Sequence, residues 1–165
     1  MTTSPEPGFA FLVRHPAHFI AFGFGAGLSP RAPGTVGTLV ALPLYALLIA
    51  AGLTALQIAW LCAPLFALGC WASGVACRSL GVHDHGGIVI DEIVAMLAVL
   101  AFAPPSLAGW ALAFALFRLF DIAKPWPIRL FDERVHGGFG VMLDDALAAL
   151  FAVIVLDLAA GLLPL

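Results

Sequence analysis

The chain has 165 residues, of which 62% are hydrophobic and 10% are charged, with a formal net charge of −3. A chain this apolar cannot cover a water-facing surface with polar groups, so its composition argues against an ordinary soluble protein and favours a membrane protein. The small net charge and the lack of a basic run also argue against a nucleic-acid partner. The length predicts a single domain, residues 1–165.

The first apolar stretch, residues 9–27, is interrupted by polar and helix-breaking residues. Arg14, His15, Pro16 and His18 lie within it, together with several glycines. A segment interrupted so often lacks the continuous apolar surface that a membrane crossing needs. We therefore predict an N-terminal interfacial or partly inserted segment.

The rest of the chain predicts an all-α, polytopic membrane helical bundle of about five spans. The stretch 36–77 is too long for one crossing of about 20 residues, and it divides at 51–54 into two spans. A short third span covers 88–103 and ends at two prolines, and the fourth covers 107–120. The fifth runs from 141 to about 163.

All the basic residues fall on one side of this predicted bundle. The turns near Gly52 and at 104–105 carry no charge, whereas the opposite loops and helix ends hold the seven basic residues, Arg14, Arg31, Arg78, Arg118, Lys124, Arg129 and Arg134. Basic loops resist translocation and stay in the cytoplasm. The sequence thus predicts that its acidic clusters meet at the cytoplasmic face.

The first polar block, residues 27–38, is a stiff loop rich in proline and glycine. It carries the hydroxyls of Ser29, Thr35 and Thr38 and leads into the first long apolar stretch. Free N–H groups at the start of a helix bind anions, and hydroxyls add donors. The alternative is a plain helix start with Thr35 as its N-cap.

The second block, residues 83–92, joins three acidic residues to the start of the third apolar stretch. The helix dipole explains one carboxylate there, but not Asp91, Glu92 and Asp84 together in a lipid-embedded chain. Paired carboxylate oxygens suit a hard cation such as Mg²⁺. His83 and His85 raise the alternative of zinc, but no further His or Cys lies nearby at ligand spacing.

The third block, residues 117–129, places charges at every third position. Arg118, Asp121 and Lys124 share one helical face, and Pro125 ends the helix. Lys124 and Arg129 flank Trp126, which is typical of an interfacial anchor beside a cationic pocket of phosphate size. The alternative is a salt-bridged helix end.

The fourth block, residues 137–145, is a glycine-rich loop that runs into the last apolar stretch. Its two acids, Asp144 and Asp145, are expected in the first turns of a helix, where one complements the dipole and the other faces inward. Asp157 lies near the far end of the same stretch. We expect Asp157 to be solvated there.

These four blocks together resemble a known family. The strings GLSPRAPGTVGTL, HDHGGIVIDEIV, FRLFDIAKPWPIRLFD and VHGGFGVMLDDALA are similar, in content and order, to the signature blocks of the phosphatidylglycerophosphatase A family. The resemblance covers residues 27–148. It implies a Mg²⁺-dependent, multi-pass enzyme of the bacterial inner membrane. Such an enzyme removes the terminal phosphate of phosphatidylglycerophosphate and leaves phosphatidylglycerol.

The residues and the resemblance together define a candidate site. The candidate catalytic residues are Asp84, Asp91, Glu92, Asp121, Lys124 and Asp145. The candidate Mg²⁺ ligands are Asp91, Glu92, Asp121 and Asp145, with Asp84 and Asp144 as further or outer candidates. The candidate substrate-binding residues are Ser29, Thr35, Arg118, Lys124 and Arg129.

Three questions stay open at the level of sequence. The first is whether water attacks the phosphorus directly or an aspartate first forms a phosphoryl-enzyme. The oligomeric state has no signature in the chain. The functional alternative is a small ion transporter that uses the carboxylates as a relay, although a relay would place acids at several membrane depths rather than at one face.

Overall fold

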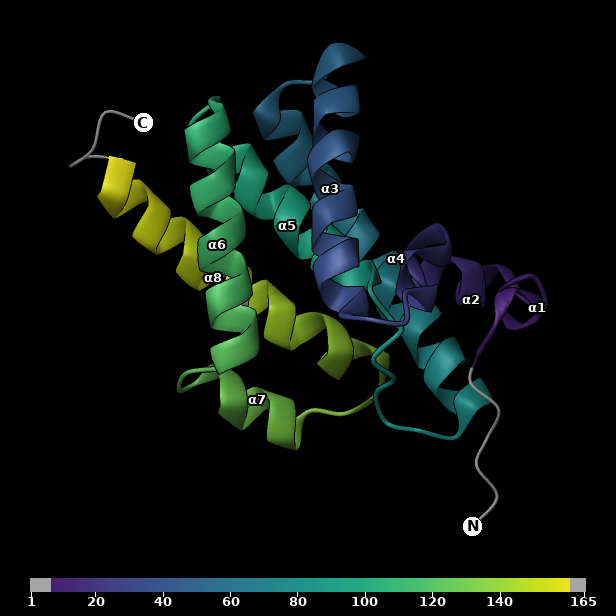
Figure 1. Cartoon of the computed structure of the whole chain (residues 1–165). Coiled ribbons are helices and arrows are strands. Elements are labelled where there is room, and N and C mark those ends of the chain that lie inside the picture. The colour runs from purple at the N-terminus through teal and green to yellow at the C-terminus, as the bar shows by residue number, and fades with distance from the viewer. Residues whose placement is uncertain (1–6, 161–165) are drawn as a thin grey trace.

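The computed structural model describes residues 7–160, and every regular element in that range is helical (Figure 1). In chain order the elements are α1 (Phe9–Leu12), α2 (Pro16–Ala21), a 3₁₀ segment η1 (Gly23–Leu28), α3 (Pro33–Ala50), α4 (Ala55–Leu80), α5 (Ile90–Phe102), α6 (Leu107–Ala123), α7 (Ile128–Arg134) and α8 (Gly137–Ala160). The all-α prediction is confirmed for this part of the chain. The predicted end of the fifth span, near residue 163, lies outside the described residues.

Within residues 7–160, three helices are long and apolar enough to cross a membrane: α3, α4 and α8. The other two predicted spans correspond to α5, with 13 residues, and α6, with 17. Both fall below the roughly 20 residues that a full crossing requires. The structure therefore supports a membrane protein with three candidate spans, and the predicted number of about five is not confirmed.

The short helix α5 lies at the centre of the bundle. Eight of its 13 residues are buried, and it packs against α3, α4 and α8. The last helix, α8, packs against α4, α5, α6 and α7. Close packing depends on small residues, as is common between membrane helices. A Cβ atom on Gly138 of α8 would lie 1.9 Å from the carbonyl oxygen of Cys70 on α4.

The predicted interfacial segment folds into α1, α2 and η1. Helix α2 packs against α4, and the buried His18 joins the two helices. Its Nε2 is hydrogen-bonded to Ser79 Oγ at 2.9 Å, and its Nδ1 to the carbonyl oxygen of Phe11 at 3.1 Å. The segment is thus held to the bundle by a polar contact, and its interfacial position stays a prediction.

Local sequence signals explain where the main helices begin. Thr54 and Gln57 form a reciprocal capping box at the start of α4, and Ser106 Oγ accepts the N–H of Gly109 at 2.9 Å at the start of α6. Helix α3 begins at Pro33, after Ala32 in a left-handed conformation. Thr35 therefore lies inside the first turn of α3, and the alternative of Thr35 as an N-cap is wrong.

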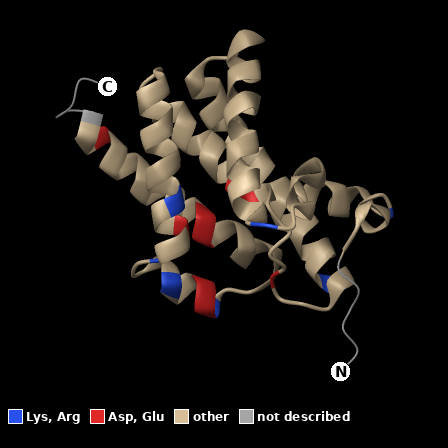
Figure 2. Ribbon diagram, viewed as in Figure 1, with Lys and Arg blue, Asp and Glu red and all other residues tan. Residues whose placement is uncertain are grey.

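Most of the charged residues gather at one end of the helical bundle, as Figure 2 shows. The α3–α4 turn and the α5–α6 turn lie at the opposite end (Figure 1). Ion pairs join segments distant in sequence: Arg118 of α6 pairs with Glu92 of α5, and Lys124 pairs with Asp144 of α8. The fold thus brings the acidic and basic blocks together at one depth of the bundle.

Candidate metal and phosphate site

Three carboxylates from two helices form the centre of the site. Asp91 and Glu92 occupy the first turn of α5, and Asp145 projects from α8. One ligand oxygen of each residue lies within 4.8 Å of the other two, a spacing that allows all three to hold one ion. We call Asp91, Glu92 and Asp145 the carboxylate triad.

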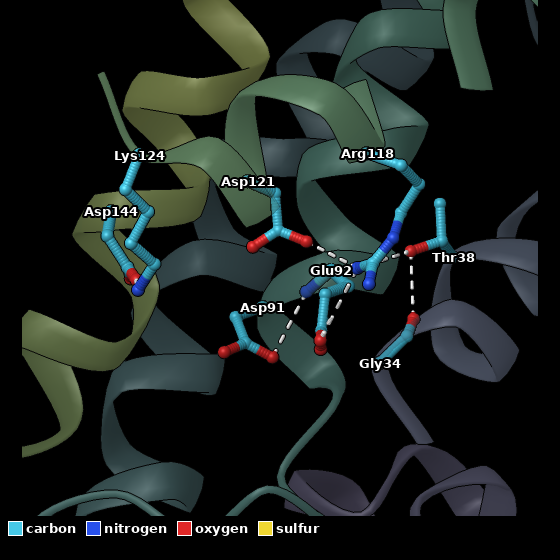
Figure 3. A network of polar contacts seen from close by, with 8 residues as sticks. All are labelled: Gly34, Thr38, Asp91, Glu92, Arg118, Asp121, Lys124 and Asp144. Carbon is cyan, nitrogen blue, oxygen red and sulfur yellow. Dashed lines mark hydrogen bonds and ion pairs between the residues drawn. The ribbon is translucent and has the colours of Figure 1, made fainter. Parts of the chain in front are cut away.

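Adjacent positions on α5 direct the first two carboxylates to different neighbours. Successive helical residues diverge by about 100°, so the side chains of Asp91 and Glu92 leave α5 in different directions, although one oxygen of each still reaches the triad. Asp91 Oδ1 accepts a hydrogen bond from the backbone N–H of Glu92 at 3.0 Å. The Asp91 residue also lines a cavity between α4, α5 and α8. Glu92 faces α3 and α6 instead, as Figure 3 shows.

Arg118 joins three helices beside Glu92 (Figure 3). Its Nη1 lies 4.0 Å from Glu92 Oε1, donates to Asp121 Oδ2, and lies 3.5 Å from Thr38 Oγ1 of α3. Thr38 Oγ1 in turn donates to the carbonyl oxygen of Gly34 at 2.8 Å. A fixed guanidinium is therefore held next to the triad, and a fixed guanidinium suits the oxygens of a phosphate group.

Lys124 supplies a second cation at the end of α6. It adopts a left-handed conformation as the C-cap of α6, and its Nζ donates to Asp132 Oδ1 at 2.7 Å and to Asp144 Oδ2 at 2.5 Å. Burial alone would lower the pKa of Lys124, but the two carboxylates outweigh burial and raise this pKa above its ordinary value. Lys124 is thus a permanent positive charge near neutral pH.

Several buried polar atoms of the site lack a partner among residues 7–160. The acceptors are Glu92 Oε2, Asp144 Oδ1 and Asp145 Oδ2, and the donor is Arg118 Nε. Buried carboxylates are costly unless they are paired or bind a metal, and buried polar atoms are normally hydrogen-bonded. Within the described chain, Asp91 and Asp145 also form no salt bridge. Such a donor set fits a cation together with an anionic group.

The ligand chemistry fits Mg²⁺ better than zinc. The triad offers only carboxylate oxygens, which suit a hard cation. The histidines of the second block have other roles: the His83 ring lies against His136, with centroids 4.7 Å apart, and His85 Nδ1 accepts the N–H of Gly87 at 3.0 Å. Neither histidine belongs to the triad.

Two further predicted site residues, Asp121 and Asp84, lie near the triad and have partners of their own. Asp121 is close enough to Asp145 for the two carboxylates to interact, but its Oδ2 is bound by Arg118. Asp84 lies in the loop before α5 and lines a 210 Å³ cavity with Asp132 and Asp144. Desolvation raises the pKa of Asp84, and the charge of Lys124 opposes this effect.

The remaining predicted substrate contacts lie outside the cluster around the triad. Ser29 Oγ donates to the carbonyl oxygen of Arg31 at 2.9 Å and so stabilises its own loop. Thr35 is half-buried in the first turn of α3, where Thr38 is the threonine that contacts Arg118. Arg129 pairs with Glu133 at 2.9 Å on the exposed surface of α7.

Two residues that contact the site cations, Thr38 and Asp132, are not among the site residues predicted from the sequence. Thr38 lies four residues after Gly34, a helical spacing that turns both residues to the same face as they approach Arg118. Asp132 lies eight residues after Lys124 and meets it only because α7 turns back along α8. The helical spacing was visible in the sequence, whereas the turn at α7 was not.

Comparison with known proteins places most of the chain in one family. The family model described as phosphatidylglycerophosphatase A matches residues 19–160. The chain belongs to the phosphatidylglycerophosphatase A family. No solved structure matches the chain significantly.

Curated relatives cover most of this family member. A protein of Haemophilus influenzae named phosphatidylglycerophosphatase A is 49% identical over 143 residues, 86% of each chain. An Escherichia coli K12 protein of the same name is 39% identical over 150 residues, 84% of this chain and 80% of its own. A Bacteroides thetaiotaomicron protein named "Putative phosphatidylinositol-3-phosphatase" is 40% identical over 149 residues, 85% of this chain and 91% of its own.

Proposed function

We propose that this chain is a lipid phosphatase that hydrolyses phosphatidylglycerophosphate to phosphatidylglycerol and phosphate. Membership of the phosphatidylglycerophosphatase A family supports this activity, as do the two relatives of that name. One observation carries the chemistry: Glu92, Asp144 and Asp145 each have a buried carboxylate oxygen with no partner among residues 7–160, and Glu92 lies 4.0 Å from the guanidinium of Arg118, whose Nε also has none there. These groups can hold a cation and a phosphate next to each other. We further propose that the chain acts as one domain.

Mg²⁺ is the cation that we propose for the site. Asp91, Glu92 and Asp145 would hold it, and Asp121 lies at the edge of the triad as a fourth candidate ligand. When bound, Mg²⁺ polarises phosphoryl oxygens and lowers the pKa of a nucleophilic water. Asp144, which is bound to Lys124, has an outer role that keeps the lysine in place.

The two cations of the site would bind the phosphate oxygens. Arg118 is anchored by Asp121, and its buried Nε has no partner among residues 7–160, while Lys124 keeps its charge between two carboxylates. Positive groups fixed in advance stabilise the charge that develops on the transferred phosphoryl group. Ser29, Thr35, Arg129 and Asp84 remain proposed contacts at the periphery, where Arg129 and Lys124 line a shared 450 Å³ surface cavity.

We also propose that the charged end of the bundle faces the cytoplasm at the bacterial inner membrane. The support is the concentration of Lys and Arg at that end, because basic segments resist translocation. The substrate carries its phosphate at headgroup level, which is the level of the triad in this orientation. The transporter alternative has no support, because the related proteins are named as phosphatases and the described carboxylates form no chain across the bundle.

Phosphate release from purified protein tests both the activity and the cation. We expect phosphatidylglycerophosphate to be hydrolysed in Mg²⁺, activity to disappear in EDTA and return with Mg²⁺, and Ca²⁺ to substitute poorly, because Ca²⁺ prefers longer bonds and more ligands. Full turnover in chelated protein would contradict the metal site. A requirement for zinc alone would instead favour ligands beyond the triad, such as His83 and His85.

A further inference from the structure

An apolar cavity of about 540 Å³ opens directly beside the carboxylate triad. It lies between α4, α5 and α8, and Asp91 is the only charged residue among those that line it. The other lining residues are apolar, and many of them are alanines. The cavity therefore has one acidic end, shared with the triad, and an apolar body.

The spacing of the lining residues shows that the cavity follows α5. Asp91, Ala95, Ala98 and Phe102 all line it, and they recur at intervals of three and four residues, which places them on one face of the helix. From Asp91 to Phe102 this face extends about 16 Å at 1.5 Å per residue. That is close to half of the roughly 30 Å hydrocarbon core, the depth of one leaflet. Ala146 and Ala149 of α8 line the same cavity.

We propose that this cavity binds one acyl chain of the lipid substrate, with the phosphate of that lipid at the triad. This inference rests on the proposed lipid phosphatase function and adds the feature that selects the substrate. An occupant of the cavity must combine a phosphate, which the site cations bind, with an apolar tail about one leaflet long. A membrane lipid in the adjacent leaflet has both features, whereas a soluble phosphate ester has only the first.

An acyl chain in this position would orient the substrate, and it would contribute little hydrophobic binding energy. Lipid tails are already in an apolar environment, so little hydrophobic energy is gained on entering the cavity. A chain held along α5 instead fixes the depth and direction of the headgroup relative to Asp91. Accurate positioning of the reacting group is a large source of rate enhancement. The cavity should therefore govern kcat/KM for long-chain lipids.

Blocking the cavity midway provides the first test. Ala98 is half-buried and lies about 10 Å along α5 from Asp91. A six-carbon chain that enters the cavity at the level of Asp91 ends before Ala98, whereas a sixteen-carbon chain that enters there passes it. We expect Ala98→Phe to lower kcat/KM for dipalmitoyl phosphatidylglycerophosphate by about tenfold or more, and to change kcat/KM for the dihexanoyl lipid by less than about twofold. Ala63→Phe, at an exposed position on α4 that lines the same cavity, should act in the same way.

Ala115→Phe is the matched control for these variants. Ala115 is exposed on α6 and does not line the cavity, so its substitution should leave both substrates unaffected. Retained dihexanoyl activity also shows that a blocked variant is folded. Equal losses on both lipids, or no loss on the dipalmitoyl lipid in either blocked variant, would overturn the proposal.

A labelling experiment tests the cavity without turnover. A phosphatidic acid with a diazirine near the end of one acyl chain should crosslink wild-type protein mainly around Phe102 and Val153, where α5 and α8 line the cavity. This labelling should fall in Ala98→Phe and persist in Ala115→Phe. Labelling spread evenly over the exposed faces of α3 and α6 would mean that the cavity holds no particular chain. If wild-type protein hydrolyses no phosphatidylglycerophosphate, the proposed function fails, while the crosslinks still decide the cavity.

Discussion

At the scale of single residues, the half-buried Asp91 and the buried Asp145 lie together without a positive partner among the described side chains. Asp91→Asn and Asp145→Asn remove charge with almost no change in volume. If these residues hold the metal, each variant should lower kcat about a hundredfold, roughly 2.7 kcal/mol of transition-state stabilisation. Asp157→Asn is the control, since Asp157 is exposed in the last turns of α8. Equal losses in Asp157→Asn and Asp145→Asn would place the chemistry elsewhere.

The same variants should have an opposite effect on stability without metal. Removing one of several buried like charges relieves repulsion, so Asp145→Asn in EDTA should unfold at the same temperature as wild type or higher. Mg²⁺ should raise the unfolding temperature of wild-type protein, because a ligand that binds only the folded state stabilises it. This increase should be largely lost in Asp145→Asn and kept in Asp157→Asn. Equal Mg²⁺ effects in all three proteins would argue against the triad as the metal site.

At the scale of elements, the approach of α3 to α5 depends on Gly34. A Cβ atom at this position would lie 2.1 Å from Glu92 Oε1, so Gly34→Ala must displace the carboxylate that faces Arg118. Alanine favours a helix over glycine by up to about 1 kcal/mol, which offsets part of the strain. We expect a fall in kcat/KM of about tenfold with little change in unfolding temperature. Gly8→Ala is the control, because a Cβ atom there meets nothing within 4 Å.

The sequence predicted where the helices begin and end better than which side chains contact one another. The break at 51–54, the end of α6 before Pro125 and the gathering of charges all follow from turn residues and apolar length. The sequence did not show that Asp121 is bound by Arg118, or that Thr38 rather than Thr35 contacts this arginine. Those contacts depend on how α3 and α6 rotate about their axes when they pack on α5, which a one-dimensional pattern does not specify.

At the scale of the whole molecule, the two ends of the bundle should lie on opposite sides of the membrane. In protein whose three native cysteines are replaced, Ala51→Cys lies at the uncharged end and Arg134→Cys at the charged end; both positions are exposed. We expect a membrane-impermeant maleimide to label Ala51→Cys in intact spheroplasts, and Arg134→Cys only after lysis, because basic segments remain in the cytoplasm. The reverse pattern would contradict the proposed orientation.

The central position of α5, together with the late position of α8 in the chain, has a consequence for biosynthesis. Helix α5 is short and begins with two carboxylates, each of which opposes insertion of an isolated helix by up to about 3 kcal/mol. Its partner α8 leaves the ribosome after all the other helices described in residues 7–160. The nascent chain must therefore hold α5 in a shallow or protected state until α8 emerges. A chain truncated after residue 136 should then be recognised by membrane quality-control proteases, although it contains two of the three candidate spans.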